Sequence, residues 1–255
     1  MSSLPLTFLG HSHNDNSETP SWNILPSPVP LSNPQAHQWE RLPLHIPPMC
    51  RLDTVLLEQA RSTRQRVQTS GPIPELSQQR AFPSISSLLN PKEESLQTPI
   101  SNAIGIHGRI TMEVPSLPNK IAMMYNMCLY LRWLVSPTKR NYEALPVFLR
   151  PLEIQLSTPH PVWVDLIVWP EARENIIKYM DWSQFHSLRA IGNKAISINW
   201  PHGQTKVFTE VSEQNLELDP AFETHIRNLE NWTFTADLSD TFPFLQNLSP
   251  GPGQT

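Results

Sequence analysis

Several features that would assign this chain to a common class of protein are scarce or missing. Only 16% of its 255 residues are charged, against roughly 25% in an average globular protein. It has 8 glycines and 2 cysteines. Cys50 and Cys128 are too few for a disulfide framework and too far apart for a CxxC site. The glycines are scattered, which excludes a glycine-rich loop that wraps a phosphate.

A long hydrophobic run is also missing. The most apolar stretch, residues 121–135, contains Asn126 and Arg132 and is shorter than the ~20 residues of a membrane-spanning helix. The first ten residues lack the positive region and the apolar core of a secretory signal. We therefore expect an intracellular protein without membrane association. Cys128 lies inside the apolar stretch and is predicted to be a reduced core residue.

The sequence contains no common catalytic motif. GxSxG, P-loop, GxGxxG and HExxH patterns are all absent. Nine histidines are present, yet His160, His186, His202 and His225 lack partners at zinc-ligand spacing. We therefore expect no enzyme activity, no cofactor and no metal site. His160 could pair with Asp165, and a structural hydrogen bond is favoured there over a general base.

The charge distribution argues against direct DNA binding. The net charge is −4, and residues 207–255, with eight acids and one base, carry −7 of it, which leaves +3 for residues 1–206. No helix is dense in basic residues and followed by leucines at every seventh position, as a basic zipper requires. Arg61, Arg64 and Arg66 could form a phosphate patch. A solvated helix face that suits the helix dipole is the favoured interpretation.

Proline is abundant, and its positions organise the chain. Of 27 prolines, nine lie in the first 50 residues, where no apolar periodicity persists. We predict a disordered proline-rich tail over residues 1–40, a folded domain over 41–248 and a flexible C-terminus over 249–255. Prolines inside the domain break helices, which predicts many short helices and excludes a long rod.

Apolar periodicity and capping signals predict the helices. The expected ranges are 53–68, 84–90, a weaker helix from Pro99 interrupted by Gly105 and Gly108, 119–135, a short turn over 141–148, 170–180, a short helix around 185–188, and 220–229 with Asp219 as its cap. Helix 119–135 is apolar on nearly all faces and should be central and buried. Its methionines at 123, 124 and 127 fit either an adaptable binding groove or, as favoured, core filling.

Two short segments are predicted to be strands. Residues 195–200 alternate between small or apolar and polar side chains, residues 201–204 have turn chemistry, and residues 206–211 can return as a second strand. Residues 149–161 are expected to be extended and kept out of a sheet interior by their prolines. The predicted fold is therefore mainly α, an irregular multi-helix domain with a small β-hairpin over about 195–211.

An ordered set of motifs resembles the C-terminal domain of unknown function found in fungal basic-leucine-zipper (bZIP) transcription factors. The motifs are residues 52–57, 82–91, 123–137, 149–161, 163–165 with 169–170, and 219–222 through 231–232, together covering about 41–245. The structural anchors of these motifs are Leu131, Trp133, Arg150, Pro151, His160, Trp163, Asp165, Trp169, Pro170, Phe222 and Trp232.

The resemblance implies a fungal protein of transcription regulation that is located in the nucleus, with the cytoplasm as the alternative. It implies no catalytic or binding residues. Because no basic zipper precedes the motifs, we expect the chain to act through protein partners, including bZIP or other transcription factors. Two alternatives stay open. One is a small-molecule-sensing domain, suggested by the methionine- and tryptophan-rich core, and the other is a fragment of a longer bZIP factor.

Overall fold

The structure is a computed structural model that describes residues 36–77, 82–92, 97–114, 116–212, 215–235 and 240–245. Residues 1–35 of the expected tail and the expected flexible end, 249–255, lie outside the described residues. The described residues from 36 onward form one compact unit. The described part is mainly helical with two small antiparallel strand pairs, which confirms the predicted fold class.

The α-helices follow one another along the chain with short connections. They are α1 (Arg51–Ser70), α2 (Pro74–Ser77), α3 (Ile85–Leu89), α4 (Pro99–Thr111), α5 (Leu117–Val135), α6 (Lys139–Glu143), α7 (Glu153–Ser157), α8 (Pro170–Tyr179), α9 (Phe185–Ala195) and α10 (Pro220–Ile226). Single 3-10 turns occupy Gln38–Glu40, Val147–Leu149, Val162–Leu166, Trp182–Gln184, Leu229–Asn231 and Pro243–Leu245. The strands are β1 (Ile196–Ile198), β2 (Phe208–Ser212), β3 (Asn215–Leu218) and β4 (Trp232–Phe234).

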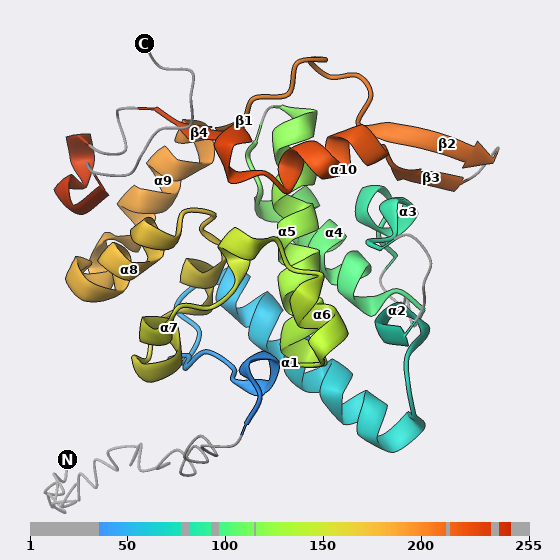
Figure 1. Ribbon diagram of the computed structural model, residues 1–255, viewed down its shortest axis with the longest axis horizontal. Helices are drawn as coiled ribbons and strands as arrows, with labels where there is room; N and C mark the ends of the chain where they lie inside the picture. The colour runs from blue at the N-terminus through green and yellow to red at the C-terminus, as the bar shows by residue number, and fades with distance from the viewer. Residues whose placement is uncertain are drawn as a thin grey trace, which may run out of the picture. The chain divides into compact units, whose positions relative to one another are not determined.

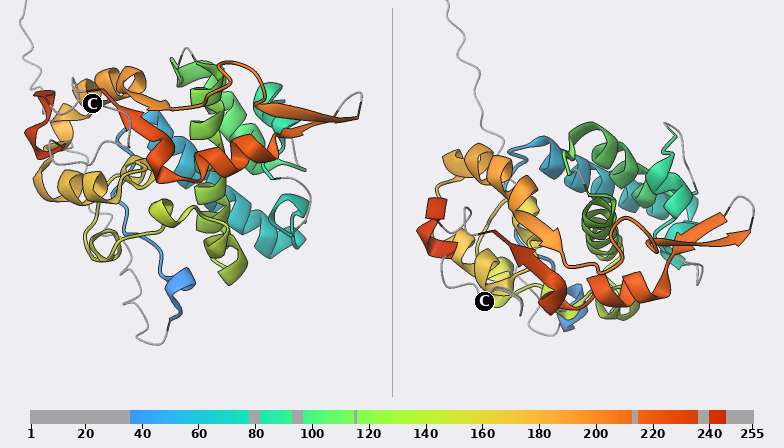
Figure 2. Two further views of the ribbon diagram at one scale, coloured as in Figure 1. Left: turned by 45° about the horizontal axis from the view of Figure 1, so that its top comes forward. Right: turned by 90° about the horizontal axis from the view of Figure 1, so that it is seen from above.

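Helix α5 is the centre of the fold, as its all-round apolar sequence predicted. It packs against α1, α4, α6 and β1 (Figure 1). The view from above looks almost along its axis, with the other elements around it (Figure 2). Cys128, Tyr130, Leu131 and Trp133 are all fully buried. Cys128 carries a free thiol, in agreement with the prediction of a reduced core cysteine.

The predicted interruption of α4 at its glycines is wrong, because the helix runs unbroken through both. A Cβ at Gly105 would lie 2.6 Å from the carbonyl oxygen of Ser87, and one at Gly108 would lie 2.9 Å from the Met124 side chain. The glycines thus allow α3 and α5 to approach α4 closely. Tertiary packing outweighs the ~1 kcal/mol by which glycine disfavours a helix relative to alanine.

Four helix ends follow local signals, whereas α10 ends at Ile226, before the predicted residue 229. Gly71 closes α1 in a positive-φ conformation at φ 83°, Pro99 and Pro170 open α4 and α8, and the Asp219 carboxylate accepts the backbone N–H of Ala221 at 2.8 Å. Arg64 adds a cap that the sequence did not reveal. Its guanidinium donates to the last carbonyls of α5, those of Leu134 and Val135.

The predicted pairing of a 195–211 hairpin is wrong, although strands form in both of its segments. Strand β1 pairs with β4, far along the chain, with Ile198 opposite Trp232. Strand β2 pairs with its neighbour β3. The reason is burial, since Ile198 and Trp232 are 6% and 1% exposed whereas β2 is largely exposed. The β2–β3 pair lies at the edge of the domain, where β3 packs against α3 (Figure 1).

The expected extended segment 149–161 contains a helix instead. Glu153–Ser157 form α7, and the Gln155 side chain accepts the N–H of Leu152 at 2.9 Å. Flanking prolines limit this helix to five residues. The folded part also begins before residue 41, because Trp39 packs against the core and its carbonyl accepts the indole N–H of Trp133 at 2.9 Å. Within the described residues, no helix combines the length and apolar character that crossing a membrane requires.

Candidate functional site

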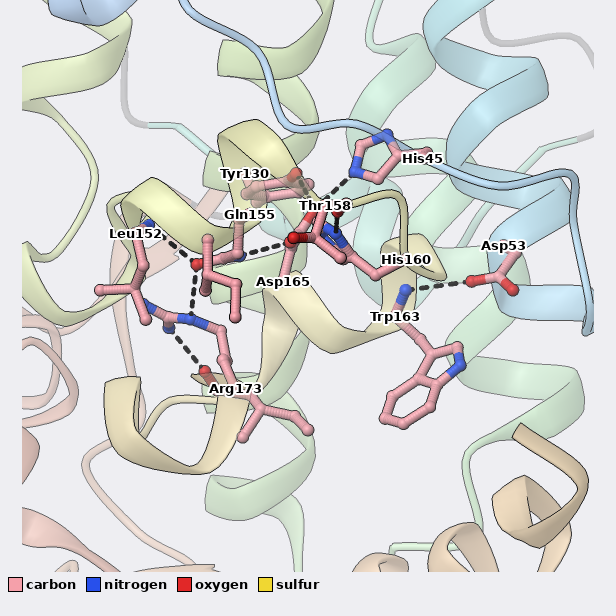
Figure 3. A network of polar contacts seen from close by, with 12 residues as sticks. His45, Asp53, Tyr130, Leu152, Gln155, Thr158, His160, Trp163, Asp165 and Arg173 are labelled. Atoms are coloured by element: carbon pink, nitrogen blue, oxygen red, sulfur yellow. Dashed lines mark hydrogen bonds and ion pairs between the residues drawn. The ribbon is translucent and has the colours of Figure 1, made fainter. Parts of the chain in front are cut away.

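A buried polar cluster forms around Asp165, whose carboxylate is fully closed to solvent. Its Oδ1 accepts hydrogen bonds from Gln155 and, at 2.8 Å, from Nε2 of His160. Its Oδ2 accepts from the Tyr130 hydroxyl and, at 2.6 Å, from Nε2 of His45. Figure 3 shows these four donors converging from separate parts of the chain. Each carboxylate oxygen therefore has two donors, the full capacity of the group.

The hydrogen bonds of His160 fix its protonation state. Nδ1 lies 2.7 Å from the carbonyl oxygen of Thr158, and Nε2 lies 2.8 Å from Asp165. A carbonyl and an ionised carboxylate only accept, so both ring nitrogens carry a proton and the ring is a cation. Burial opposes this charge, but the Asp165 carboxylate outweighs it and raises the pKa of His160. For Asp165, burial alone would raise the pKa, but hydrogen bonds from His160 and His45 hold it far below its usual range.

Arg173 supports the cluster from the next helix, α8. Its Nη1 donates to the carbonyls of Phe148 and Ile167, both at 2.7 Å, and its Nη2 to that of Arg150 at 3.1 Å. Its Nε donates at 3.1 Å to Gln155, which in turn donates to Asp165. Burial lowers the pKa of Arg173 to about 10, so it remains a cation at neutral pH. One buried arginine thus supplies hydrogen-bond donors to three backbone carbonyls that lie outside the α-helices and strands.

The cluster ties the N-terminal strap, residues 41–46, to the rest of the domain. The backbone N–H of Leu44 donates to the carbonyl of Gln155, and that of Ile46 donates to the carbonyl of His160. The backbone N–H of His160 donates in turn to the carbonyl of Leu44, and all three distances are 2.9–3.0 Å. His45 completes the connection through its side chain. We call Asp165, its four donors and Arg173 the clasp. The role of the clasp is structural, because a reacting molecule could reach Asp165 only by displacing one of its donors.

The clasp also contains ligand types that metals prefer. The donor atoms of His45, His160 and Asp165 lie within 4.8 Å of one another, and two imidazoles with a carboxylate suit zinc or iron. However, both Nε2 atoms donate directly to the carboxylate. An ion would therefore have to displace two protons from a network that is already satisfied. The sequence search missed this group because His45 lies far outside any local spacing pattern.

We expect the clasp to make stability depend on pH in a defined direction. The raised pKa of His160 gives stability that is complete below the unfolded value of about 6.5 and is lost as pH rises through the folded value. The lowered pKa of Asp165 gives stability present above about 3.9 and lost at lower pH. The melting-temperature difference between wild type and His160→Gln should therefore be largest from about pH 4 to 6.5 and shrink above it.

Comparing the two proteins removes contributions common to both, such as that of His107. The amide that His160→Gln introduces can still donate one hydrogen bond to Asp165. The difference in melting temperature therefore reports the loss of the imidazolium charge. A difference that grows steadily from about pH 6 to about pH 9 would contradict the charged state assigned to His160.

The other predicted anchors lie in the core or at its edge. Leu131, Trp133, Phe222 and Trp232 are at most 1% exposed, Trp163 and Trp169 are 6% and 4% exposed, and the Trp169 ring meets Phe234 edge-on. Arg150 lies over the Tyr142 ring at 5.1 Å. Pro151 and Pro170 are half-buried. His160 and Asp165 pair, as their spacing predicted. Sequence reasoning missed His45, Tyr130, Gln155 and Arg173.

A second site is an apolar pocket on the other side of Trp163. It has a volume of about 190 Å³ and is lined by residues of α1, α4, α5, α8, α9, β1 and β4, by Trp163 and residues 166–169, and by Leu245. Met123 and Met127 lie in its wall, whereas Met124 fills the core beside Gly108. Met123 and Met127 therefore fit the interpretation of a groove, and Met124 fits that of core filling.

Apart from Arg51 and Arg189, the polar groups of the pocket wall are few and uncharged at neutral pH. Burial, with a smaller contribution from Arg189 and Arg51, lowers the pKa of His107 to about 4, so its ring is neutral. Burial likewise raises the pKa of the Cys50 thiol. Both side-chain amide atoms of Asn126 and the indole Nε1 of Trp163 are buried without a partner among the described residues. Such unpaired groups are rare in native proteins, and Arg132, Arg150 and His225 have others outside this pocket.

Comparison with known proteins finds a similarity over part of the chain. Residues 128–249 match the model described as a domain of unknown function (DUF3425). The match covers just under half of the chain and includes the clasp from Tyr130 to Arg173, whereas His45 and the N-terminal wall of the pocket lie before it. No curated protein matches, and no solved structure matches.

Proposed function

We propose that this protein is a non-catalytic regulator of transcription whose helical domain binds a small molecule in the apolar pocket. The pocket is the observation that carries the proposal. Its wall combines tryptophan, methionine and aliphatic side chains with the unpaired polar atoms of Asn126 and Trp163. A concave, mostly apolar site with a few polar groups is the usual form of a ligand site, and flexible methionines let such a wall adapt to its ligand.

The fold supports coupling between this pocket and the rest of the domain. Trp163 lines the pocket through its ring, while its backbone N–H donates to the fully buried Asp53 carboxylate of α1 at 3.0 Å. Two residues further on, Asp165 holds the clasp (Figure 3). A ligand that shifts Trp163 would therefore act on α1 and on the N-terminal strap. These are the segments that a partner protein could sense.

The regulatory part of the proposal rests on the sequence resemblance to fungal bZIP transcription factors. With a net charge of −4 and an acidic C-terminal part, the chain has a charge balance that disfavours phosphate contacts along a duplex. We therefore propose that it acts in the nucleus through bZIP or other transcription-factor partners. The absence of space around Asp165 and the lack of catalytic motifs support a role without catalysis.

The test combines ligand binding with location. A thermal-shift screen of metabolites should raise the melting temperature for at least one compound, because binding to the native state alone stabilises it by about 2.7 kcal/mol at a ligand concentration of about 100 Kd. A tagged protein should enter the nucleus, and a mobility-shift assay should show DNA retention only with a partner. A flat screen would contradict the ligand role. Exclusion from the nucleus under all growth conditions would contradict the regulatory role.

A further inference from the structure

The charged side chains that line the pocket are all positive. Arg51 and Arg189 line the pocket and are exposed, and both act on the pKa of His107, so they lie near the same part of the wall. None of the described residues that line the pocket is an aspartate or a glutamate, although acids outnumber bases by 23 to 19 in the chain. Arg51 also opens α1, a helix of 20 residues, whose N-terminal end carries partial positive charge. This part of the wall therefore attracts an anion.

The interior of the pocket sets the size and character of the ligand body. Its volume of about 190 Å³ is somewhat larger than the roughly 150 Å³ of an apolar cavity that holds benzene. One or two fused rings fit that space, and a long acyl chain does not. The aromatic wall formed by Trp163, Trp169, Phe185 and Trp232 favours flat, apolar rings.

We propose that the ligand of this pocket is a compact one- or two-ring molecule that carries a carboxylate. Its rings lie in the apolar interior, and its carboxylate lies near Arg51 and Arg189. The proposal rests on the proposed ligand-binding function and names its chemical class. Asn126 and Trp163, whose side chains have buried polar atoms without a partner among the described residues, line the same pocket.

Arg51 is available for the carboxylate, because it makes no hydrogen bond or ion pair with the described residues. Arg189 uses one nitrogen, Nη2, to donate to the carbonyl of Thr111 at 3.1 Å, and this bond holds the side chain near the end of α4. An arginine offers five donors, so Arg189 can bind a carboxylate as well. Both arginines therefore have donors for a ligand carboxylate.

The experiment compares 1-naphthylacetate with 1-naphthylacetamide, which has the same rings and no charge. Calorimetric titration of the full chain at about pH 7 and low salt should give about tenfold tighter binding of the acid, from two exposed arginine–carboxylate pairs. The preference should weaken at high salt. The double variant Arg51→Gln/Arg189→Gln should bind the two compounds equally and should bind the amide as the wild type does.

A matched control and a second variant keep the result interpretable. Arg61→Gln removes an exposed arginine of the same helix that does not line the pocket, and it should leave the preference unchanged. Arg51→Gln alone removes no hydrogen bond or ion pair within the described residues and should reduce the preference to about threefold, half of its logarithm. This single variant decides the question even if the double variant folds poorly.

The outcomes separate the two proposals. If neither compound binds and the metabolite screen is flat, the ligand-binding function is overturned. If both compounds bind equally to the wild type, the pocket binds ligands but the carboxylate class is overturned. If the acid is preferred and Arg51→Gln keeps the full preference, the assigned place of the carboxylate is wrong.

Discussion

Replacing Asp165 with Asn should lower the free energy of unfolding by about 3–5 kcal/mol, as expected for removing one partner of a buried ion pair. The variant leaves the His160 cation without its anion in a site that is closed to solvent. It also places an amide N–H₂ where all four neighbours are donors. Chemical denaturation at about pH 6, where the ion pair is fully formed, measures the effect.

Two comparisons show whether charge is the cause. The double variant Asp165→Asn/His160→Gln removes both charges and should recover part of the loss. Glu153→Gln breaks the exposed ion pair with Arg41, whose shortest distance is 2.8 Å, and should leave the unfolding midpoint unchanged. If Asp165→Asn unfolds at the same denaturant concentration as the wild type, Asp165 is not the anion that holds the clasp together.

Replacing Trp133 with Ala should also cost about 3–5 kcal/mol, the usual range for removing a large aromatic side chain from a core. Trp133 is fully buried on α5, and its ring meets Tyr130 and Tyr142 edge-on, with centroids 5.8 and 5.9 Å away. Its removal also leaves the carbonyl of Trp39 without a donor. Thermal and chemical unfolding of the variant measure the loss.

The Trp133→Phe variant separates packing from hydrogen bonding. It keeps most of the apolar volume and should lose less than the Ala variant. The Trp163→Ala variant should have a similar cost of about 3–5 kcal/mol. Because it enlarges the existing pocket, it should also abolish ligand binding. Unchanged melting of either Ala variant would contradict the core placement of that tryptophan.

Local signals in the sequence identified most helices and their ends. Gly71, Pro99, Pro170 and Asp219 act at helix ends through their own backbone or neighbouring N–H groups, so their effect needs no distant partner. The central burial of α5 was equally visible, because a helix that is apolar on all faces has no side to expose. The pairing of His160 with Asp165 could also be predicted, because the two residues lie close together in the sequence.

Contacts between distant segments could not be predicted in this way. The pairing of β1 with β4, the helix at 153–157 and the continuity of α4 through Gly105 depend on what packs beside each segment. The pocket is the clearest case, because its wall draws on elements whose sequences separately indicate only core residues. Arg51 and Arg189 lie in helices far apart along the chain, and no periodicity links them.

A mainly helical domain of short helices could be inferred from local sequence, because scarce glycine, abundant proline and apolar periodicity act within a few residues. The buried state of the tryptophan and aliphatic anchors was accessible in the same way. Which polar side chains meet depends instead on the folded chain. His45 reaches Asp165 across 120 residues, and Arg173 donates to three carbonyls in two segments of the chain. The physical reason is that a buried charge is stable only with its full set of partners, and those partners are brought together by chain folding rather than by sequence proximity.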